Sequence, residues 1–553
     1  MSTSIPLAAA VTAALAAATL GFSPAGLAQQ THLHDDQAVE QDASIGTVDF
    51  QVSCDQAVQP GFDRALGLMH HMMYEQARSG FEQVAAADPD CAMAYWGIAT
   101  TLFQPLWGTR PSSEEIERGQ QNVRKAMQAD PGSERERLLV RATEAFFAAP
   151  EDATVRTRIE RWAEAMEAAH GASPEAPDTA ALYALSRLAL AQWASDPALL
   201  RDEAETVLRS VWQRNPQHPG AVHYTIHATD ADGRASNALD VVEAYADIAP
   251  QVPHALHMPS HIYVRLGDWP SVIDWNRRSA EAALRHPVGD AASHHYIHAM
   301  DYLTYARLQR GEDAGAEALH DQVAARGPHQ PTFISAYHVA ALPARLAVER
   351  RDWQDAAALQ PRSPDYLPWD QARWPEALTW FARGLGAVKT GNTEEAGKAE
   401  GKLQSLRDKA RDEGDENFAN YIEVDRRILA ATLAHAQGRA EEAVRLMRSA
   451  AELEASIDKH PVTPGALLPS NEALGNLLLE LERPQEALAA FRASDSIWPG
   501  RFNTLAGAAR AARAAGDEAA EREFNDRLSK VAGDSDRSAV REARQRLGQV
   551  DSR

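Results

Sequence analysis

The sequence predicts an all-α solenoid, a superhelix of about ten to twelve helix-turn-helix repeats. Helix-forming stretches separated by tight turns recur over most of the 553 residues, and 44% of the residues are hydrophobic. No run alternates apolar and polar residues as a half-buried strand does. A chain of this length is too long for one compact core, whereas a solenoid buries each repeat only against its neighbours.

Prolines before the expected helices give the length of the repeat. Pro219, Pro253 and Pro287 follow one another at intervals of 34 residues, the period of the tetratricopeptide repeat (TPR). Ala77 and Phe81 match the A-x3-F signature of that repeat. Equivalent helices of neighbouring repeats pack at about 8–10 Å between axes, so residues at the same place in successive repeats are expected to lie close together.

The chain divides into five expected segments. Residues 7–20 are uncharged and rich in Ala and Leu, and Gly26-Leu27-Ala28 has the small-x-small pattern of a cleavage site. The segments are a signal peptide over 1–28, a flexible segment over 29–55, N-terminal TPR-like repeats over 56–215, His-rich central TPR repeats over 216–330 and C-terminal TPR repeats over 331–553. No other stretch is apolar enough to span a bilayer, so a periplasmic or secreted protein is expected, with no transmembrane segment in its mature chain.

Charge and motifs exclude several classes of function. The formal net charge is -23 and the isoelectric point is near 5.3. Nucleic acids and anionic membranes attract basic surfaces, so neither is an expected partner. The sequence has no glycine-rich phosphate loop, Walker motif or nucleophile elbow, and no nucleotide cofactor is expected.

The two cysteines, Cys54 and Cys91, flank the first expected helical pair. In an oxidising compartment a disulfide between them would tie the N-terminal segment to the solenoid. Two separately buried thiols explain the same residues equally well.

The central segment is rich in histidine. Its stretches HPGAVHYTIHATD, VPHALHMPSHIYVRLGDW and SHHYIHAMDYLTYARL place histidines and aspartates at i, i+3, i+4 and i+7, spacings that share one side of a helix. The candidate metal ligands are His223, His227, His254, His257, His261, His294, His298, Asp230 and Asp301.

The register of the third stretch has two interpretations. Counting from Pro287 puts His295 level with His227 and His261, whereas matching the H-x-x-I-H-A-x-D pattern aligns His298 with His227. The two differ by almost one helical turn, so the third helix contributes ligands to the same face in either case.

The residue types point to transition-metal chemistry. Neutral imidazole suits Cu, Zn and Fe, and an added carboxylate extends the choice to Mn. One H-x3-H pair is a weak signal, but such pairs on three neighbouring repeats predict a site for one or two ions. Asp230 and Asp301 are candidates for metal ligands, for groups that orient imidazoles, or for a catalytic base on bound water. An open coordination position would permit metal-dependent hydrolysis or oxidation; the sequence does not decide whether the protein is an enzyme.

Four phrases carry a family resemblance. DCAMAYWGIA, HPGAVHYTIHATD, HALHMPSHIYVRLGDW and KHPVTPGALLPS resemble those of a group of exported bacterial TPR proteins, over nearly the whole mature chain. The resemblance implies a TPR-like fold and an exported location, and it leaves the function open. In TPR proteins generally the first helix of each pair lines the concave groove, which would place His254, His257 and His261 on the groove wall.

The alternative hypothesis is a metal-free scaffold whose concave groove binds an envelope protein, a peptide or a small molecule. The histidines would then donate hydrogen bonds to a partner, or simply pack. The expected groove-lining residues are Tyr224, Tyr263, Arg265, His295, Tyr305 and His338.

Three histidines outside the central segment are interpreted as structural. His70 and His71 are expected to pack locally, with about four or more repeats between them and the central cluster. His460, in a Pro-rich connection, is interpreted as a loop residue and not as a ligand.

Overall fold

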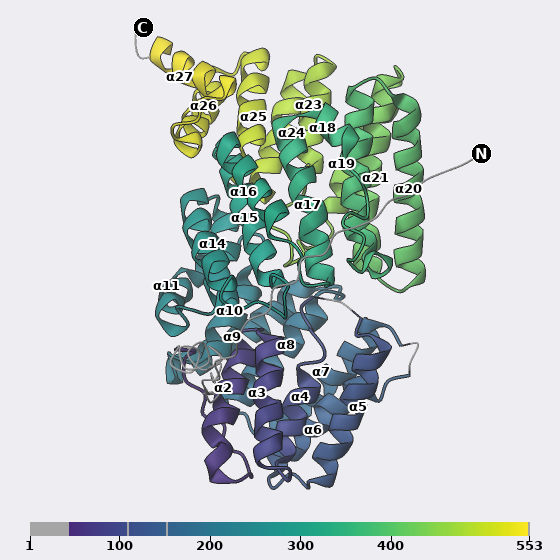
Figure 1. Cartoon of the computed structure of the whole chain (residues 1–553). Coiled ribbons are helices and arrows are strands. Elements are labelled where there is room, and N and C mark those ends of the chain that lie inside the picture. The colour runs from purple at the N-terminus through teal and green to yellow at the C-terminus, as the bar shows by residue number, and fades with distance from the viewer. Residues whose placement is uncertain (1–43, 108–109, 151–152, 551–553) are drawn as a thin grey trace, which may run out of the picture. The chain divides into compact units, whose positions relative to one another are not determined.

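The computed structural model describes residues 44–107, 110–150 and 153–550, and the predicted signal peptide lies outside these ranges. The described chain is helical throughout, with two isolated β-bridges and no strand (Figure 1). Its helices are η1 (Gln56–Val58), α2 (Gln59–His70), α3 (Tyr74–Ala87), α4 (Ala92–Thr100), α5 (Ser113–Gln128), α6 (Glu134–Phe147), α7 (Val155–Ala172), α8 (Pro177–Ala191), α9 (Pro197–Arg214), α10 (Pro219–Thr229), η2 (Ala235–Ala238), α11 (Leu239–Ile248), α12 (Pro253–His257), α13 (Pro259–Leu266), α14 (Trp269–Ala283), α15 (His294–Gln309), α16 (Asp313–Arg326), α17 (Phe333–Arg350), α18 (Trp353–Ala358), η3 (Trp369–Gln371), α19 (Arg373–Lys389), α20 (Thr393–Asp412), α21 (Glu416–Ala436), α22 (Ala440–Glu454), α23 (Ser470–Glu480), α24 (Pro484–Ile497), α25 (Phe502–Ala515), α26 (Glu518–Ala532) and α27 (Ser538–Val550).

The helices pack as successive pairs, which confirms the predicted all-α TPR-like solenoid. Each helix contacts the next along the chain within pairs such as α2–α3, α8–α9 and α25–α26. The first helices of neighbouring pairs also contact one another: α8 packs on α10, α10 on α13, α15 on α17, and α17 on α19. The candidate ligands lie on this row of first helices.

The junction between α13 and α14 is set by a glycine. Gly267 ends α13 with a φ of 69°, a left-handed conformation that favours glycine. A β-carbon on Gly267 would lie 2.8 Å from the carbonyl oxygen of Pro499, far inside van der Waals contact. The Trp269 indole donates to the Gly500 carbonyl at 2.9 Å next to this point. Gly267 therefore permits close contact between the central and C-terminal repeats.

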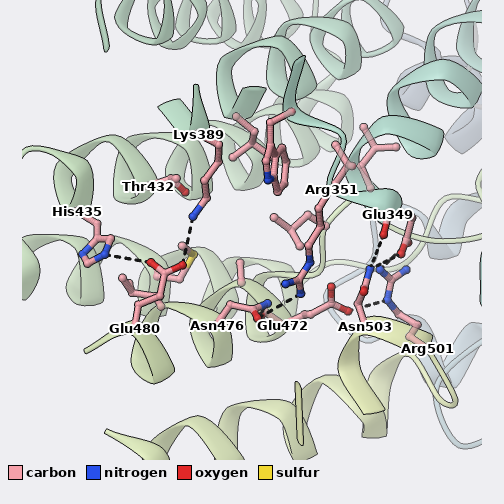
Figure 2. Close-up of a pocket in the computed structure, with 18 residues that line it drawn as sticks. Glu349, Arg351, Lys389, Thr432, His435, Glu472, Asn476, Glu480, Arg501 and Asn503 are labelled. Carbon is pink, nitrogen blue, oxygen red and sulfur yellow. Dashed lines mark hydrogen bonds and ion pairs between the residues drawn. The ribbon is translucent and has the colours of Figure 1, made fainter. Parts of the chain in front are cut away.

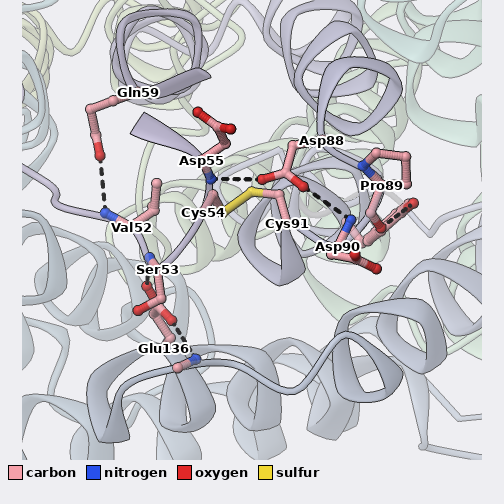
Figure 3. Close-up of a disulfide and its surroundings, with 12 residues drawn as sticks. Val52, Ser53, Cys54, Asp55, Gln59, Asp88, Pro89, Asp90, Cys91 and Glu136 are labelled. Carbon is pink, nitrogen blue, oxygen red and sulfur yellow. Dashed lines mark hydrogen bonds between the residues drawn. A yellow bond between two sulfur atoms is a disulfide. The ribbon is translucent and has the colours of Figure 1, made fainter. Parts of the chain in front are cut away.

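A disulfide joins Cys54 to Cys91 (Figure 3). It links the segment before α2 to the start of α4, and the two cysteines are 37 positions apart in sequence. The backbone amide of Ser53 donates to Glu136 at 2.7 Å, which anchors the same segment on α6. Of the two possibilities open for the cysteines, the structure contains the disulfide.

The third His-rich helix does not start at Pro287, as the 34-residue count predicted. Residues 285–293 form a turn in which Val288 pairs with Ala291, and α15 begins at His294. Because α15 starts later than predicted, the ring centroid of His298 lies 4.1 Å from that of His257. The ring centroid of His295 lies 5.3 Å from that of His254. Neither predicted register holds, although α15 still presents histidines to the same face.

The predicted separation between His70 and the central cluster is also wrong. Helix α2 packs directly on α10, and the His70 carbonyl oxygen accepts a hydrogen bond of 2.6 Å from the His223 Nδ1. Counting repeats along the chain cannot reveal this contact, because it joins helices that are not neighbours in the row. His70 and His71 are fully buried, as expected for core residues.

Residues 456–469, here named the closing loop, run from α22 to α23 and lie against the central first helices. The Tyr302 hydroxyl donates to the carbonyl oxygens of Pro461 and Thr463, at 3.0 Å each. His460 is a loop residue, as predicted, but it is buried and donates from Nε2 to the Trp107 carbonyl at 3.2 Å. The loop thus covers the side of the row that carries the histidines.

Candidate metal centre

Histidines from α10, α12, α13, α15 and α17 form one continuous cluster. Nearly all of them are buried; His227 is partly exposed and borders a surface cavity. Two groups of three offer ring nitrogens that lie within 4.8 Å of one another, one made of His257, His261 and His298 and the other of His223, His227 and His254. We call them the first and the second triad.

Hydrogen bonds fix the tautomers of the first triad. The Asn276 amide nitrogen donates to the Val272 carbonyl, so its oxygen faces His257 and accepts from Nδ1 at 2.7 Å. The Nδ1 of His261 donates to a carboxylate oxygen of Asp230 at 2.8 Å. In both rings the Nε2 atom is therefore left with a lone pair and no proton.

The third ring reaches the same state through a relay. Asp301 accepts from the Nδ1 of His338 at 3.0 Å, so the Nε2 of His338 is an acceptor. That atom accepts from the Nδ1 of His298 at 2.7 Å. The Nε2 of His298 then carries a lone pair, and it is buried with no hydrogen-bond partner among the described residues.

The first triad consequently brings lone pairs together. The Nε2 atoms of His257 and His261 are 3.0 Å apart, although neither carries a proton for the other. Protonating one ring would relieve the conflict, but burial and the neighbouring imidazoles hold the pKa values of His257 and His298 well below the usual value. A cation held between the three nitrogens satisfies all of them at once.

The second triad has the same character. The Nδ1 of His223 donates to the His70 carbonyl, so its Nε2 is a lone pair, and that atom has no partner in the described chain. The Nε2 of His227 and both ring nitrogens of His254 are likewise buried without partners there. Burial lowers the pKa of His227 to about 3 and that of His254 well below its usual value, so both rings are neutral at pH 7.

A third group, made of His70, Asp178 and His218, differs from the two triads because it includes a carboxylate that faces both rings. His70 bonds to Asp178 at 2.9 Å and to the Tyr224 hydroxyl at 3.2 Å. His218 caps α10 by accepting the Ala221 amide on Nδ1, so its proton is on Nε2, 3.2 Å from Asp178. Both rings of this group thus face a carboxylate, although the Nε2 of His218 is buried without a hydrogen-bond partner among the described residues.

The two aspartates have their oxygens engaged by cations and imidazoles. Asp230 accepts from Arg265 at 2.8 Å, from Lys459 at 2.9 Å and from His261. Burial alone would raise the pKa of Asp230, but Lys459 and Arg265 hold it well below its usual value. Asp301 likewise accepts a hydrogen bond from Arg345 at 3.0 Å and another from His338. Each aspartate thus contacts an imidazole of the cluster, and its own charge is neutralised.

The remaining predicted residues divide between the cluster and its surroundings. His295 lies beside His254, and His294 packs on His295 with ring centroids 4.3 Å apart. Tyr305 is buried and accepts from Arg501 at 2.9 Å. Three of the predicted groove residues lie against rings of the triads: His338 is 4.7 Å from His298, His295 is 5.3 Å from His254 and Tyr224 is 5.3 Å from His223, between ring centroids. The rest are Tyr263 between α13 and α14, Arg265 on Asp230, and Tyr305.

Several residues that complete the site were not predicted. Trp107 packs over His254 and His298, with ring centroids 6.0 and 5.8 Å away. Asn276 and Arg345 orient site residues from α14 and α17. The sequence showed a Pro-rich connection that contains Lys459. It did not indicate the contact of Lys459 with Asp230, because the two residues are 229 positions apart in sequence.

A cavity of about 340 Å³ leads from the surface to the second triad. His227 and Asp230 form part of its wall, together with Lys459 and His460 of the closing loop. The second triad is therefore the one nearer to solvent.

A separate pocket of about 240 Å³ lies among the first helices of the C-terminal pairs (Figure 2). Lys389 reaches Glu480 from α19, and Glu480 also contacts His435 of α21. At the other end Arg501 binds Glu349 and Glu472 at 2.6 and 3.1 Å. Polar side chains from successive repeats thus line one groove.

Comparisons with known proteins identify no family for this chain. No protein-family model matches the chain, and no curated protein matches it. Among solved structures, a tetratricopeptide repeat protein from Parabacteroides merdae is 12% identical, with 54% of this chain and 97% of that chain covered and a TM-score of 0.29. A dimer of human IFIT1 with m7Gppp-AAAA is 14% identical over 90% and 94% of the two chains, with a TM-score of 0.36. The Cut9 and Hcn1 hetero-tetramer of APC/C is 10% identical over 89% and 90%, with a TM-score of 0.30.

Proposed function

We propose that this protein is a TPR-like metalloprotein in which the two histidine triads hold one or two transition-metal ions. The observation that carries the proposal is the set of buried Nε2 lone pairs that converge without a proton between them. Unsatisfied buried nitrogens are unfavourable by roughly 1–3 kcal/mol each, and a bound ion removes that cost.

The donor set narrows the choice of ion. Three neutral imidazoles suit Zn, Cu or Fe, whereas Mn favours carboxylate and water ligands. Asp230 and Asp301 act through the imidazoles they contact, because a carboxylate bonded to the far side of a ligating ring fixes its tautomer and raises its basicity. Their place in the site is that of orienting groups.

The first triad is the stronger site on this account. All three of its rings have an acceptor on Nδ1, namely Asn276, Asp230 and His338. Three protein ligands leave one position of a tetrahedral ion for water or a substrate. Metal-dependent hydrolysis or oxidation is therefore chemistry to assay once the ion is known.

Elemental analysis tests the proposal. The protein is purified without a His tag, reconstituted with Zn, Cu or Fe in turn, and analysed beside a His261→Gln/His298→Gln variant. A control variant changes two histidines outside the cluster, His320→Gln/His435→Gln. We expect one or two bound equivalents in the parent and control, and at least one fewer in the triad variant. Equal metal content in all three proteins, or none in any after reconstitution, would refute the metal site.

A second candidate function, recognition of a protein or peptide, is favoured by the C-terminal groove. A TPR-like fold is a common protein-binding scaffold, and polar side chains from α17, α19, α21, α23 and α25 face the pocket of Figure 2. Capture of a partner from cell-envelope extract by the parent, lost on changing Lys389→Ala/Asn476→Ala, would support it. Capture that survives this change would argue against the groove.

The protein is also proposed to be exported. The Cys54–Cys91 disulfide supports an oxidising compartment. None of the described helices is long and apolar enough to cross a membrane. Fractionation of cells expressing the full chain tests the proposal: we expect a processed protein outside the cytoplasm, and an unprocessed cytoplasmic protein would contradict export.

A further inference from the structure

A third cavity, of about 310 Å³, lies between α19, α21 and the closing loop. Aromatic side chains form much of its wall. The Trp374 ring lies 4.7 Å from that of Tyr337 and 4.6 Å from that of Tyr421, between centroids, and the indole of Trp498 lines the cavity too. Neither histidine triad borders this cavity.

One carboxyl group in this wall lacks a partner. Asp425 follows Tyr421 by four residues on α21, so both side chains lie on the same face of the helix. Asp425 is only 8% exposed, lines the cavity, and has no hydrogen bond or ion pair with any described residue. A buried, unpaired carboxylate is strongly unfavourable, so Asp425 needs either a proton or a counter-ion.

A second carboxyl, that of Glu454, lies near the first. Glu454 ends α22 and accepts a hydrogen bond from the Ser470 amide at 2.9 Å. Burial and the charge of Glu454 raise the pKa of Asp425 well above its usual value, and burial raises the pKa of Glu454 to about 7. Without a ligand, the pair therefore holds protons near neutral pH.

We propose that this cavity binds a small organic cation, an ammonium group on a compact apolar body, with Asp425 as its counter-ion. Aromatic rings attract such cations by roughly 0.5–2 kcal/mol, and Tyr337, Trp374 and Tyr421 line the same cavity as the Asp425 carboxyl group. A neutral ligand would fill the same volume but leave Asp425 unpaired.

None of the cationic side chains that the structure describes is paired with Asp425. Lys459 and Arg265 line the cavity, but both are bound to Asp230. The other charged or titratable groups that face the two carboxyls or line the cavity are Tyr337, Tyr421, Asp232, Asp458, His460, Glu472 and Arg501. Asp425, which lines the cavity together with the aromatic rings, is therefore the carboxyl group that a cationic ligand would pair with.

Isothermal titration with choline and its uncharged isostere 3,3-dimethylbutan-1-ol tests the proposal. The parent, Asp425→Asn and a control, Glu416→Gln, are compared at pH 8.5; Glu416 is an exposed carboxylate on the same helix. We expect choline to bind the parent and the control at least tenfold more tightly than the isostere. Asp425→Asn should lose at least tenfold in affinity for choline and nothing for the isostere.

A measurement on the parent alone guards against a variant that fails to fold. Choline keeps its charge at every pH, whereas the carboxyl pair takes up protons as the pH falls, so choline affinity should drop at least tenfold between pH 8.5 and 5.5. Equal binding of choline and the isostere, an unchanged affinity of folded Asp425→Asn, or no binding of millimolar choline by the parent at pH 8.5 would each overturn the proposal.

Discussion

At the scale of single residues, the tautomers decide what the histidines can do. A histidine spacing in the sequence gives position on a helix but not which ring nitrogen carries the proton. Here Asn276, Asp230 and His338 each accept from an Nδ1 atom and leave an Nε2 lone pair in the first triad. The hydrogen-bond partners of the triad therefore decide which ring nitrogens are free to bind a metal.

The relay from Asp301 makes a prediction about one substitution. In Asp301→Asn the amide oxygen faces the obligatory donor Arg345, so the amide NH₂ group faces the Nδ1 of His338 and reverses its tautomer. His338 then donates to His298, which must move its proton to Nε2 and loses its lone pair. We expect metal affinity at the first triad to fall about 10–100-fold, measured by chelator competition.

The control for this substitution is Asp495→Asn, which removes a carboxylate paired with Arg527 away from the cluster. It should keep the parent's metal affinity. An affinity of Asp301→Asn equal to that of the control would show that the relay does not set the tautomer of His298.

At the scale of elements, turns and loops account for the parts of the site that sequence reasoning missed. The 34-residue proline spacing correctly predicted the starts of α10 and α12, because those helices begin at Pro219 and Pro253. The spacing predicted the wrong start for α15, because the turn over 285–293 adds residues before the helix. A constant repeat length cannot predict such an insertion. The closing loop and Trp107 reach the cluster only through tertiary contacts, which no local pattern encodes.

Two glycines with the same backbone conformation test the contact at the end of α13. Gly391→Ala adds a methyl group in open space at a φ of 85° and should cost about 1 kcal/mol of unfolding free energy from backbone strain alone. Gly267→Ala adds the same strain and a clash with the Pro499 carbonyl, so its cost should be larger by about 1–3 kcal/mol. Urea denaturation measures both losses of unfolding free energy. Equal losses would mean that the segment around Pro499 moves away from the added methyl group without an energetic cost.

The disulfide gives a prediction for the N-terminal pair of repeats. It closes a loop between residues 37 apart, which corresponds to roughly 4 kcal/mol of lost chain entropy in the unfolded state. Cys54→Ser/Cys91→Ser should therefore lower the unfolding free energy by about 2–4 kcal/mol at the same ionic strength and pH. A change below about 0.5 kcal/mol would show that the packing of Ser53 and Glu136 holds this segment without the bond.

At the scale of the whole molecule, the solenoid explains how a chain with so many buried polar side chains remains folded. Each repeat supplies one face to its neighbours, so histidines from five helices are brought together without a single large core. The fold class and the ligand-bearing helices could be predicted from composition and spacing. The grouping into two triads depended on the turn over 285–293, which sets the start of α15, and the pairing of Asp230 with Lys459 depended on the closing loop. Neither could be predicted from the sequence.

Buried neutral histidines make the metal-free protein sensitive to acid. Burial lowers the pKa of His71 and His460 to about 3, and those of most cluster histidines fall too. Because these folded-state pKa values lie below the unfolded value of 6.5, the unfolded state takes up more protons. The contribution of these histidines to stability is therefore complete above about pH 6.5 and is lost as the pH falls toward 4.

We expect the unfolding free energy of the metal-free protein to fall by more than about 1.4 kcal/mol per pH unit between pH 6 and 4, as measured by urea denaturation at a series of pH values. His261→Gln/His298→Gln should show a shallower fall, since it removes two of the groups that take up protons. A flat profile would mean that these rings are already protonated in the folded state.

The most direct test of the central claim is an anomalous difference map from a crystal of the reconstituted protein, collected on either side of the absorption edge of the bound metal. We expect a peak about 2.0–2.1 Å from the Nε2 atoms of His257, His261 and His298, and a second peak at His223, His227 and His254 if two ions bind. A metal peak elsewhere, or ordered water between these nitrogens with no anomalous signal, would contradict it.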